Sequence, residues 1–228
     1  MGEAARIAEA GDARTVPPVL PDRDASLGDL RFQALLAADQ WAQLSPPVRR
    51  RFAKRLAGGA TAVYVGEVAA IEISLAGRML ARAARLIGGP LPLVWEAPAP
   101  SVVTVTEDVA TGGQIWTRLY ARRRGFPQVI QSSKRFAGPT GLEECVGRGV
   151  GMALKVSVED GALVFRSAHY FVTLLGRRLR LPRWAEPGRL TVAHTELGDG
   201  RFAFTLDITH PRLGRLLRQH VVFREAPT

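Results

Sequence analysis

The sequence has a single cysteine, few lysines and no long apolar run. Cys145 has no second cysteine to pair with, so no disulfide can form within the 228 residues, which fits a reducing compartment. The apolar runs fall short of the roughly 20 residues that a membrane-spanning helix needs. The N-terminus MGEAARIAEAGDARTV lacks the apolar core of a secretory signal. We therefore expect a cytoplasmic protein.

Nucleotide-binding and metal-binding motifs are also lacking. The glycine-rich residues 147–151 lead into a predicted strand, whereas a phosphate-binding loop opens a helix. We interpret them as a bend or bulge at a strand entrance. The four histidines have no helical i, i+4 spacing, and Cys145 has no CxxC partner. The sequence therefore predicts neither a metal site nor a cofactor.

The net charge of +10 comes almost entirely from arginine, because only three of the 31 basic residues are lysines. A basic balance favours nucleic acid or another anionic partner. The arginines, however, are spread over the chain, with clusters at residues 49–51, 122–124, 177–180 and 212–218. No aromatic signature of an RNA-binding sheet accompanies them, and a GC-rich genome would also produce such arginine usage. Nucleic-acid binding is therefore not the favoured function.

The chain is expected to form one domain over residues 27–228, preceded by a flexible tail. Residues 1–26 combine acids, small residues and a proline cluster, which is typical of a mobile segment. Two helices are predicted to open the domain, the first ending near Leu44 and the second running from Ser45 to about Leu56. The arginines at 49–51 are interpreted as the solvent-facing side of the second helix.

The pattern then changes to a strand followed by an amphipathic helix. Residues 60–73 alternate with β-branched side chains and predict a strand. Residues 75–87 predict a helix that acts as a lid over a sheet. Its apolar stripe contains Leu75, Met79, Leu80, Ala83, Leu86 and Ile87, and its other side carries Arg78, Arg82 and Arg85. A basic amphipathic helix also fits an anionic membrane surface, and an exposed apolar stripe would favour such docking.

From Ser101 onward the sequence predicts strands joined by short turns, which makes neighbouring strands antiparallel. The predicted strands are residues 102–109, 114–123, 128–136, 150–158, 163–174, 190–197, 202–208 and 216–224. The fold class is therefore α+β: a large curved antiparallel β-sheet or barrel-like meander, lipocalin-like or START-like, with an inserted amphipathic helix and two N-terminal helices. Such a sheet encloses a concave apolar pocket, where a ligand site is expected.

The stretch GQIWTRLYARRRG at residues 113–125 supplies the main candidate site residues. Strand periodicity puts Trp116, Arg118 and Tyr120 on one face, and Ser132 and Lys134 are expected on a neighbouring strand. On a concave face, the aromatics would form the pocket wall and Arg118 would pair with a carboxylate or phosphate. On a convex face, the same side chains would form an exposed cross-strand ladder. Periodicity does not reveal which face is inside.

His169 and His194 complete the predicted ligand-binding residues, because each lies inside a predicted strand and is a candidate to face the same cavity. The expected function is non-catalytic binding of an apolar or amphipathic small molecule. One alternative is a small hydrolase or isomerase that uses a pocket histidine as base. The other is an accessory domain that docks on a reductase or on an anionic membrane.

The block from Ser101 to Glu225 resembles the bacterial family catalogued as domain of unknown function 4166. The matching features are Trp116 with Arg118, the Val-Glu-Asp-Gly turn at 158–161 with Phe165 and Ser167, Leu181-Pro182, and the HPRLG motif at 210–214. The opening FQALLAADQWAQLSPPVRRRF is also similar. The family has no established activity, so the resemblance implies no catalytic residues. Some members are fused to Rossmann-type or saccharopine-dehydrogenase-like reductase domains, which implies an accessory role beside a separate oxidoreductase.

Overall fold

The structure is a computed structural model that describes residues 28–93 and 96–226. The predicted N-terminal tail lies outside the described residues. The helical elements are η2 (Gln33–Leu35), α1 (Ala38–Gln43), α2 (Pro46–Phe52), α3 (Leu75–Ala83), η3 (Ala84–Ile87) and η4 (Arg183–Ala185). The strands are β1 (Ala62–Ile73), β2 (Ala99–Asp108), β3 (Gly113–Tyr120), β4 (Gln128–Arg135), β5 (Glu143–Gly147), β6 (Val150–Glu159), β7 (Ala162–Leu174), β8 (Arg177–Arg180), β9 (Arg189–Gly198), β10 (Arg201–His210) and β11 (Gly214–Glu225).

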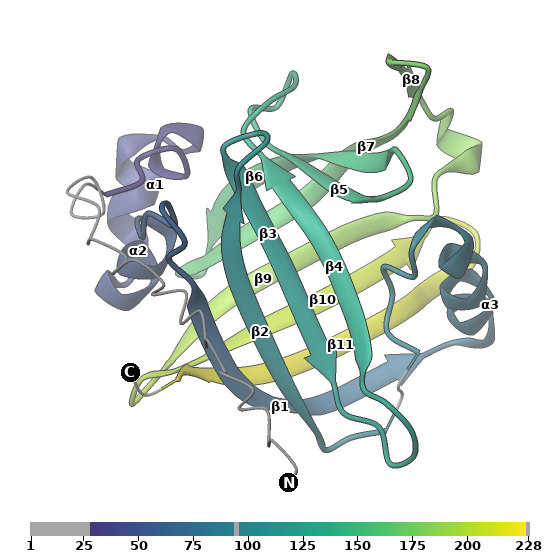
Figure 1. Cartoon of the computed structure of the whole chain (residues 1–228), viewed down its shortest axis with the longest axis horizontal. Helices are drawn as coiled ribbons and strands as arrows, with labels where there is room; N and C mark the ends of the chain where they lie inside the picture. Colours follow the sequence, from purple (N-terminus) through teal and green to yellow (C-terminus); the bar gives the residue numbers. More distant parts are fainter. Residues whose placement is uncertain (1–27, 94–95, 227–228) are drawn as a thin grey trace, which may run out of the picture.

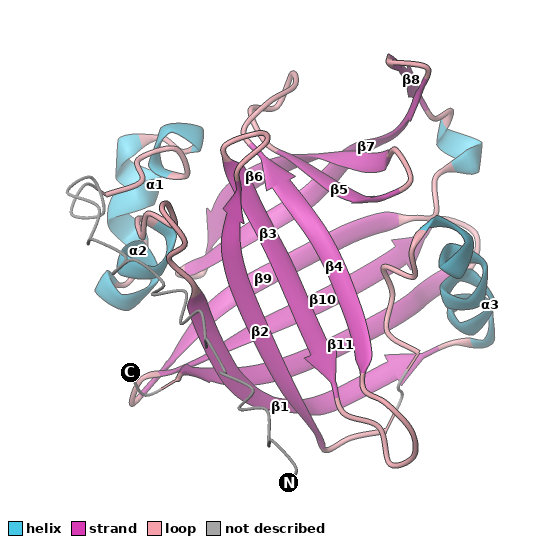
Figure 2. Cartoon of the chain, in the orientation of Figure 1, coloured by secondary structure: helices cyan, strands magenta, loops and turns pink. Residues whose placement is uncertain are grey.

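The strands form one antiparallel sheet that closes into a barrel (Figure 2). Its hydrogen-bonded order is β6-β5-β4-β3-β2-β1-β11-β10-β9-β7, and pairing between β6 and β7 closes the ring. Ten strands therefore build the barrel, and β8 is an extra strand attached to the end of β7. The sequence prediction of a curved antiparallel meander is confirmed, in the lipocalin-like form. The strands β5 and β8 were not predicted, because each is only four or five residues long.

The strand β7 has different partners along its length. Its first part, from Leu163 to Arg166, pairs with β9, and its last part, from Phe171 to Leu174, pairs with β8. A β-bulge interrupts the pairing with β6 between Ser167 and His169. An extra residue shifts the alternation of side chains beyond it, which is why Phe165 and Tyr170 both line the barrel interior despite their odd spacing.

Helices cover both ends of the barrel (Figure 1). The end beside α1 and α2, here called the base, contains the buried side chains of Trp41, Leu44, Val48 and Phe52. The opposite end, here called the lid end, lies beside α3 and η3. The first predicted helix is shorter than expected, because it is divided into η2 and α1.

The helix α3 turns only part of its apolar surface toward the barrel. Ser74 caps the helix by accepting a hydrogen bond from the Gly77 amide at 3.1 Å. Gly77 lies so close to β11 that a Cβ atom there would overlap the carbonyl oxygen of Leu216. This contact fixes the rotation of the helix. The apolar stripe predicted from the sequence is consequently divided: Leu80, Ala83 and Ile87 line the interior, whereas Leu75, Met79 and Leu86 are exposed.

Substitution of Gly77 by alanine tests this contact. In an ordinary helix interior Gly→Ala stabilises by up to about 1 kcal/mol. Here we expect Gly77→Ala to destabilise the protein by about 1–3 kcal/mol, because the added methyl group displaces α3 from β11. The measurement is the free energy of unfolding in urea, with the exposed substitution Met79→Ala in the same helix as control. A gain in stability for Gly77→Ala would contradict the close approach.

Candidate ligand-binding cavity

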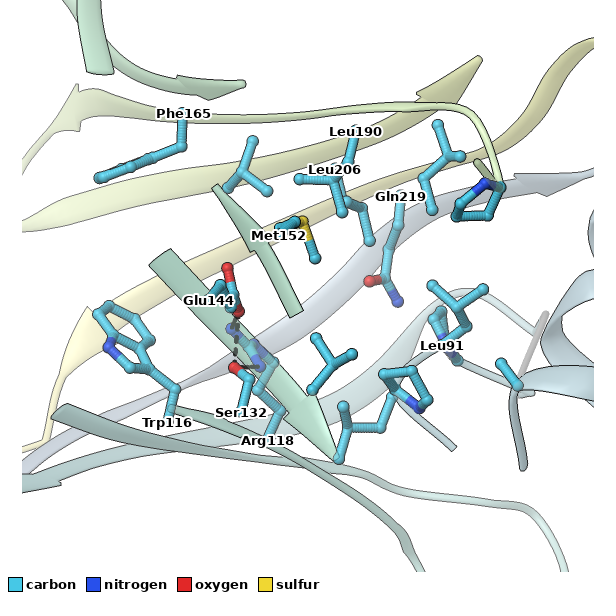
Figure 3. A pocket seen from close by; sticks show the side chains of 18 of the residues that line it. Leu91, Trp116, Arg118, Ser132, Glu144, Met152, Phe165, Leu190, Leu206 and Gln219 are labelled. Atoms are coloured by element: carbon cyan, nitrogen blue, oxygen red, sulfur yellow. Dashed lines mark hydrogen bonds and ion pairs between the residues drawn. The ribbon is translucent and has the colours of Figure 1, made fainter. Parts of the chain in front are cut away.

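The barrel encloses a cavity of about 330 Å³ that extends from the wall strands to the lid end. Most of the side chains around it are aliphatic or aromatic, and Figure 3 shows Leu91, Met152, Phe165, Leu190 and Leu206 pointing into it. Ligand pockets have volumes of roughly 300–1,000 Å³ and are mostly apolar with a few placed polar groups. The cavity is at the lower end of this range.

Trp116, Arg118 and Tyr120 lie on the concave face of β3 and line the cavity. Their inward position follows from the alternation along the strand. Ser132 and Lys134 on β4 are directly opposite Trp116 and Gln114 in the register, so they point to the same side. The structure therefore brings five of the seven predicted site residues together in one cavity, and the exposed ladder that the sequence left open is not formed.

These polar groups form one buried ionic cluster around Glu144 of β5 (Figure 3). Lys134 Nζ lies 3.0 Å from Glu144 Oε2, and the Ser132 hydroxyl donates to Glu144 Oε1 at 2.6 Å. Arg118 donates to Ser132 Oγ at 3.0 Å and places a second guanidinium nitrogen 3.5 Å from Glu144 Oε1. The Lys134 ammonium also lies 5.0 Å from the Trp116 ring centre, within reach of a cation–π interaction.

The electrostatics of the cluster keep Glu144 ionised. Burial alone would raise the pKa of this carboxyl, but Lys134, Arg118 and the hydrogen bond from Ser132 outweigh it and lower the pKa to about 2. Burial lowers the pKa of Lys134, although the ion pair with Glu144 opposes this effect. Among the described residues that line the cavity, Glu144 is the only acid and Arg118 and Lys134 are the basic residues. With both bases protonated, the cluster carries one excess positive charge.

Gln219 of β11 adds a second polar group to the cavity wall, apart from the ionic cluster. The Tyr120 hydroxyl donates to Gln219 Oε1 at 3.3 Å, and burial raises the pKa of Tyr120. The Gln219 amide nitrogen is buried and has no hydrogen-bond partner among the described residues. Because a buried donor without a partner costs free energy, this amide is available to an acceptor inside the cavity.

The structure does not bring His169 and His194 into this cavity. His169 is paired with Ala153, next to the inward pair Tyr170 and Met152, so its side chain points away from the interior. His194 is fully buried at the base, where it packs against Phe52, Phe202 and Phe204. Burial, with the nearby Arg51 charge, lowers the pKa of His194 to about 3. In the described ranges there is also no group of three or more acidic, histidine or cysteine residues placed to hold a metal ion.

The sequence predicted that Arg51 of α2 faces solvent. This prediction is wrong, because Arg51 lies in the interior of the base. Its guanidinium lies 3.9 Å from the Phe202 ring centre and 2.9 Å from Glu196 Oε2. It also lies 3.4 Å from His194 Nε2. Because a neighbouring cation and deep burial both oppose protonation of His194, this cluster holds a neutral imidazole in the core of the base.

The residue that the sequence prediction missed is Glu144, since β5 was not recognised as a strand. The alternation in Glu143-Glu-Cys-Val-Gly147 is a possible signal, but it is only five residues long. Glu143 points to the outer side, where it is buried and forms an ion pair with Arg178 of β8. Two adjacent acids thus have different partners, and a sequence pattern alone does not distinguish them.

A closed antiparallel barrel with an apolar cavity and an inward-facing ionic cluster defines a lipocalin-like class of protein, compatible with small-molecule binding. Within this class the chain belongs to the family described as Domain of unknown function (DUF4166), whose model matches residues 44–223. The resemblance found in the sequence is therefore confirmed over most of the chain. No curated protein matches the chain. Among the described helices, none has the length and apolar character needed to cross a membrane.

Proposed function

We propose that this protein binds an amphipathic small molecule with one anionic group inside the barrel. The observation that carries the proposal is the grouping of two basic side chains, Arg118 and Lys134, around the single acid Glu144 within an otherwise apolar cavity. An unneutralised charge in an apolar site is costly. A ligand carboxylate would neutralise it and would accept hydrogen bonds from the guanidinium group.

The arrangement of the cavity also favours an elongated ligand. The ionic cluster lies on the β3–β5 side of the wall, whereas the surroundings toward the lid end are apolar, with Leu80, Ile87 and Leu91. An acid group at the cluster would leave its hydrocarbon part among these residues. The Gln219 amide offers a donor to a second polar atom of the ligand. A medium-chain fatty acid is the simplest compound with these properties.

The substitution Arg118→Met tests the role of the charge. We expect the wild-type protein to bind dodecanoate more tightly than dodecanol, measured by isothermal titration calorimetry below the critical micelle concentration. Loss of a charge-assisted hydrogen bond costs about 1.5–3 kcal/mol, or roughly 10- to 150-fold in affinity. Arg118→Met should therefore weaken dodecanoate binding by about this factor and leave dodecanol binding nearly unchanged.

The matched control is Arg124→Met, which removes an exposed arginine from the turn between β3 and β4. It should keep the wild-type preference for the acid. The proposed function fails if neither compound binds the wild-type protein. The proposed role of the charge fails if Arg118→Met and Arg124→Met have the same ratio of affinities.

A further inference from the structure

We propose that the lid end of the barrel docks on the surface of an anionic membrane. This inference goes beyond the proposed function and does not depend on it, because it concerns the outer surface of the lid end and not the cavity. It rests on two separate distributions over the molecule, one of exposed apolar side chains and one of charge.

The exposed apolar side chains are concentrated at the lid end. In an antiparallel barrel, alternate connections lie at opposite ends, and the connections after β1, β3, β7 and β10 all lie at the lid end. Of the thirteen large apolar side chains exposed in the described part of the chain, nine belong to these connections or to the strand ends beside them. They are Leu75, Met79, Leu86, Phe126, Leu174, Leu175, Leu179, Trp184 and Leu213. Such a concentration marks an interaction surface.

The charge at the same end is strongly positive. Residues 75–93, 121–127, 173–185 and 210–213 contain no aspartate or glutamate. Their exposed arginines without an ion pair to a described acid are Arg82, Arg85, Arg122, Arg124, Arg177, Arg180, Arg183 and Arg212. The base, in contrast, carries both signs of charge, with Asp108, Glu159, Asp160 and Asp199 in or beside its turns and Arg49 and Arg50 on α2.

The acids nearest to the lid end do not cancel this charge. Glu96 forms an ion pair with Arg123 at 2.9 Å, and Asp207 and Glu72 both pair with Arg215, at 3.3 Å and 3.8 Å. Glu186, whose carboxylate lies 3.5 Å from the Tyr170 amide, forms no ion pair with a described residue, but its single negative charge does not offset the eight arginines. The free arginines on the rim are therefore available to an external anion.

The mixture of apolar and basic side chains favours a membrane over other anionic partners. Arginine side chains can place their charge at the lipid phosphates, while leucine, methionine and tryptophan enter the interface between head groups and acyl chains. Nucleic acid would use the positive charge but would leave exposed side chains such as Leu86 and Leu175 in water. A lipid surface with negative charge uses both kinds of side chain together.

Vesicle flotation with the full chain tests this proposal. The vesicles contain either phosphatidylcholine alone or an equimolar mixture of phosphatidylcholine and phosphatidylglycerol. We expect binding to the anionic vesicles that decreases with added salt. The lid-end variant Leu86→Ser/Arg85→Gln changes one exposed apolar and one exposed basic residue. It should lower the partition coefficient by about tenfold.

The matched control changes the same kinds of residue at the base. Val109→Ser/Arg224→Gln removes an exposed apolar side chain and an exposed arginine, so the net charge of the two variants is identical. This control should bind like the wild-type protein. Absence of binding to anionic vesicles would overturn the proposal and leave the lid end for an acidic protein partner. Equal losses in the two variants would also overturn it, since attraction would then follow net charge and not the lid end.

Discussion

Acidification from pH 6.5 toward pH 3 is expected to destabilise the protein by on the order of 4 kcal/mol through His194 alone. The reason is burial of the imidazole, reinforced by the Arg51 charge, which lowers the pKa of His194 from 6.5 to about 3. The unfolded chain takes up a proton below pH 6.5, whereas the folded protein does not do so until about pH 3. The stabilisation is therefore complete above pH 6.5 and is lost as the pH falls.

Urea unfolding between pH 7 and pH 5.5 isolates this effect, because the unfolded chain protonates its glutamates mainly below that range, near their ordinary pKa of 4.5. The slope of stability against pH should disappear in His194→Leu, which keeps an apolar side chain among the aromatic rings. It should persist in His169→Gln, where the replaced imidazole is only half-buried. An unchanged slope in His194→Leu would show that another group binds the proton.

Removal of the Glu144 charge is expected to have a comparable effect on stability. In Glu144→Gln, Lys134 and Arg118 lose the carboxylate that lies 3.0 Å and 3.5 Å from them. Breaking a buried ion pair by neutralising one partner costs about 3–5 kcal/mol, because the remaining charge stays buried without compensation. The measurement is the free energy of unfolding at pH 7.

Two further variants separate this explanation from simple damage to packing. The double variant Glu144→Gln/Lys134→Met also removes one of the remaining cations and should recover much of the lost stability. Glu159→Gln breaks the exposed pair with Arg166 and should cost no more than about 1 kcal/mol. If the double variant is less stable than Glu144→Gln, the cost does not come from the uncompensated charge.

Much of the barrel wall was predictable because its information is local. Alternating side chains and short turns identify the long strands, and the alternation correctly put Trp116, Arg118 and Tyr120 on one face. Closure was not predictable in the same way. Besides the local β6–β7 hairpin, it requires pairing of β1 with β11 and of β7 with β9, which are distant in sequence or separated by another strand.

The missed features at the site have the same origin. The sequence favours a solvated Arg51, but the contact with Phe202 and Glu196 comes from strands about 150 residues away. The sequence made His169 and His194 candidates to face the same cavity, but the bulge in β7 turns the His169 side chain to the outer face of the barrel. The ion-pair partner of Lys134 lies on β5, which is too short to give a clear periodic signal. Each error reflects a non-local contact, one extra residue in a strand, or a strand too short to show a period.

Closure of the barrel has a consequence for the behaviour of the protein at high concentration. A sheet whose last strand is unpaired can recruit strands from other molecules and aggregate. Because β6 and β7 pair, each barrel strand has two partner strands, and among the described strands β8 alone has a single partner strand. That strand is four residues long and contains Arg177, Arg178 and Arg180. Like charges on so short an edge repel a second copy, so self-association through strand addition is disfavoured.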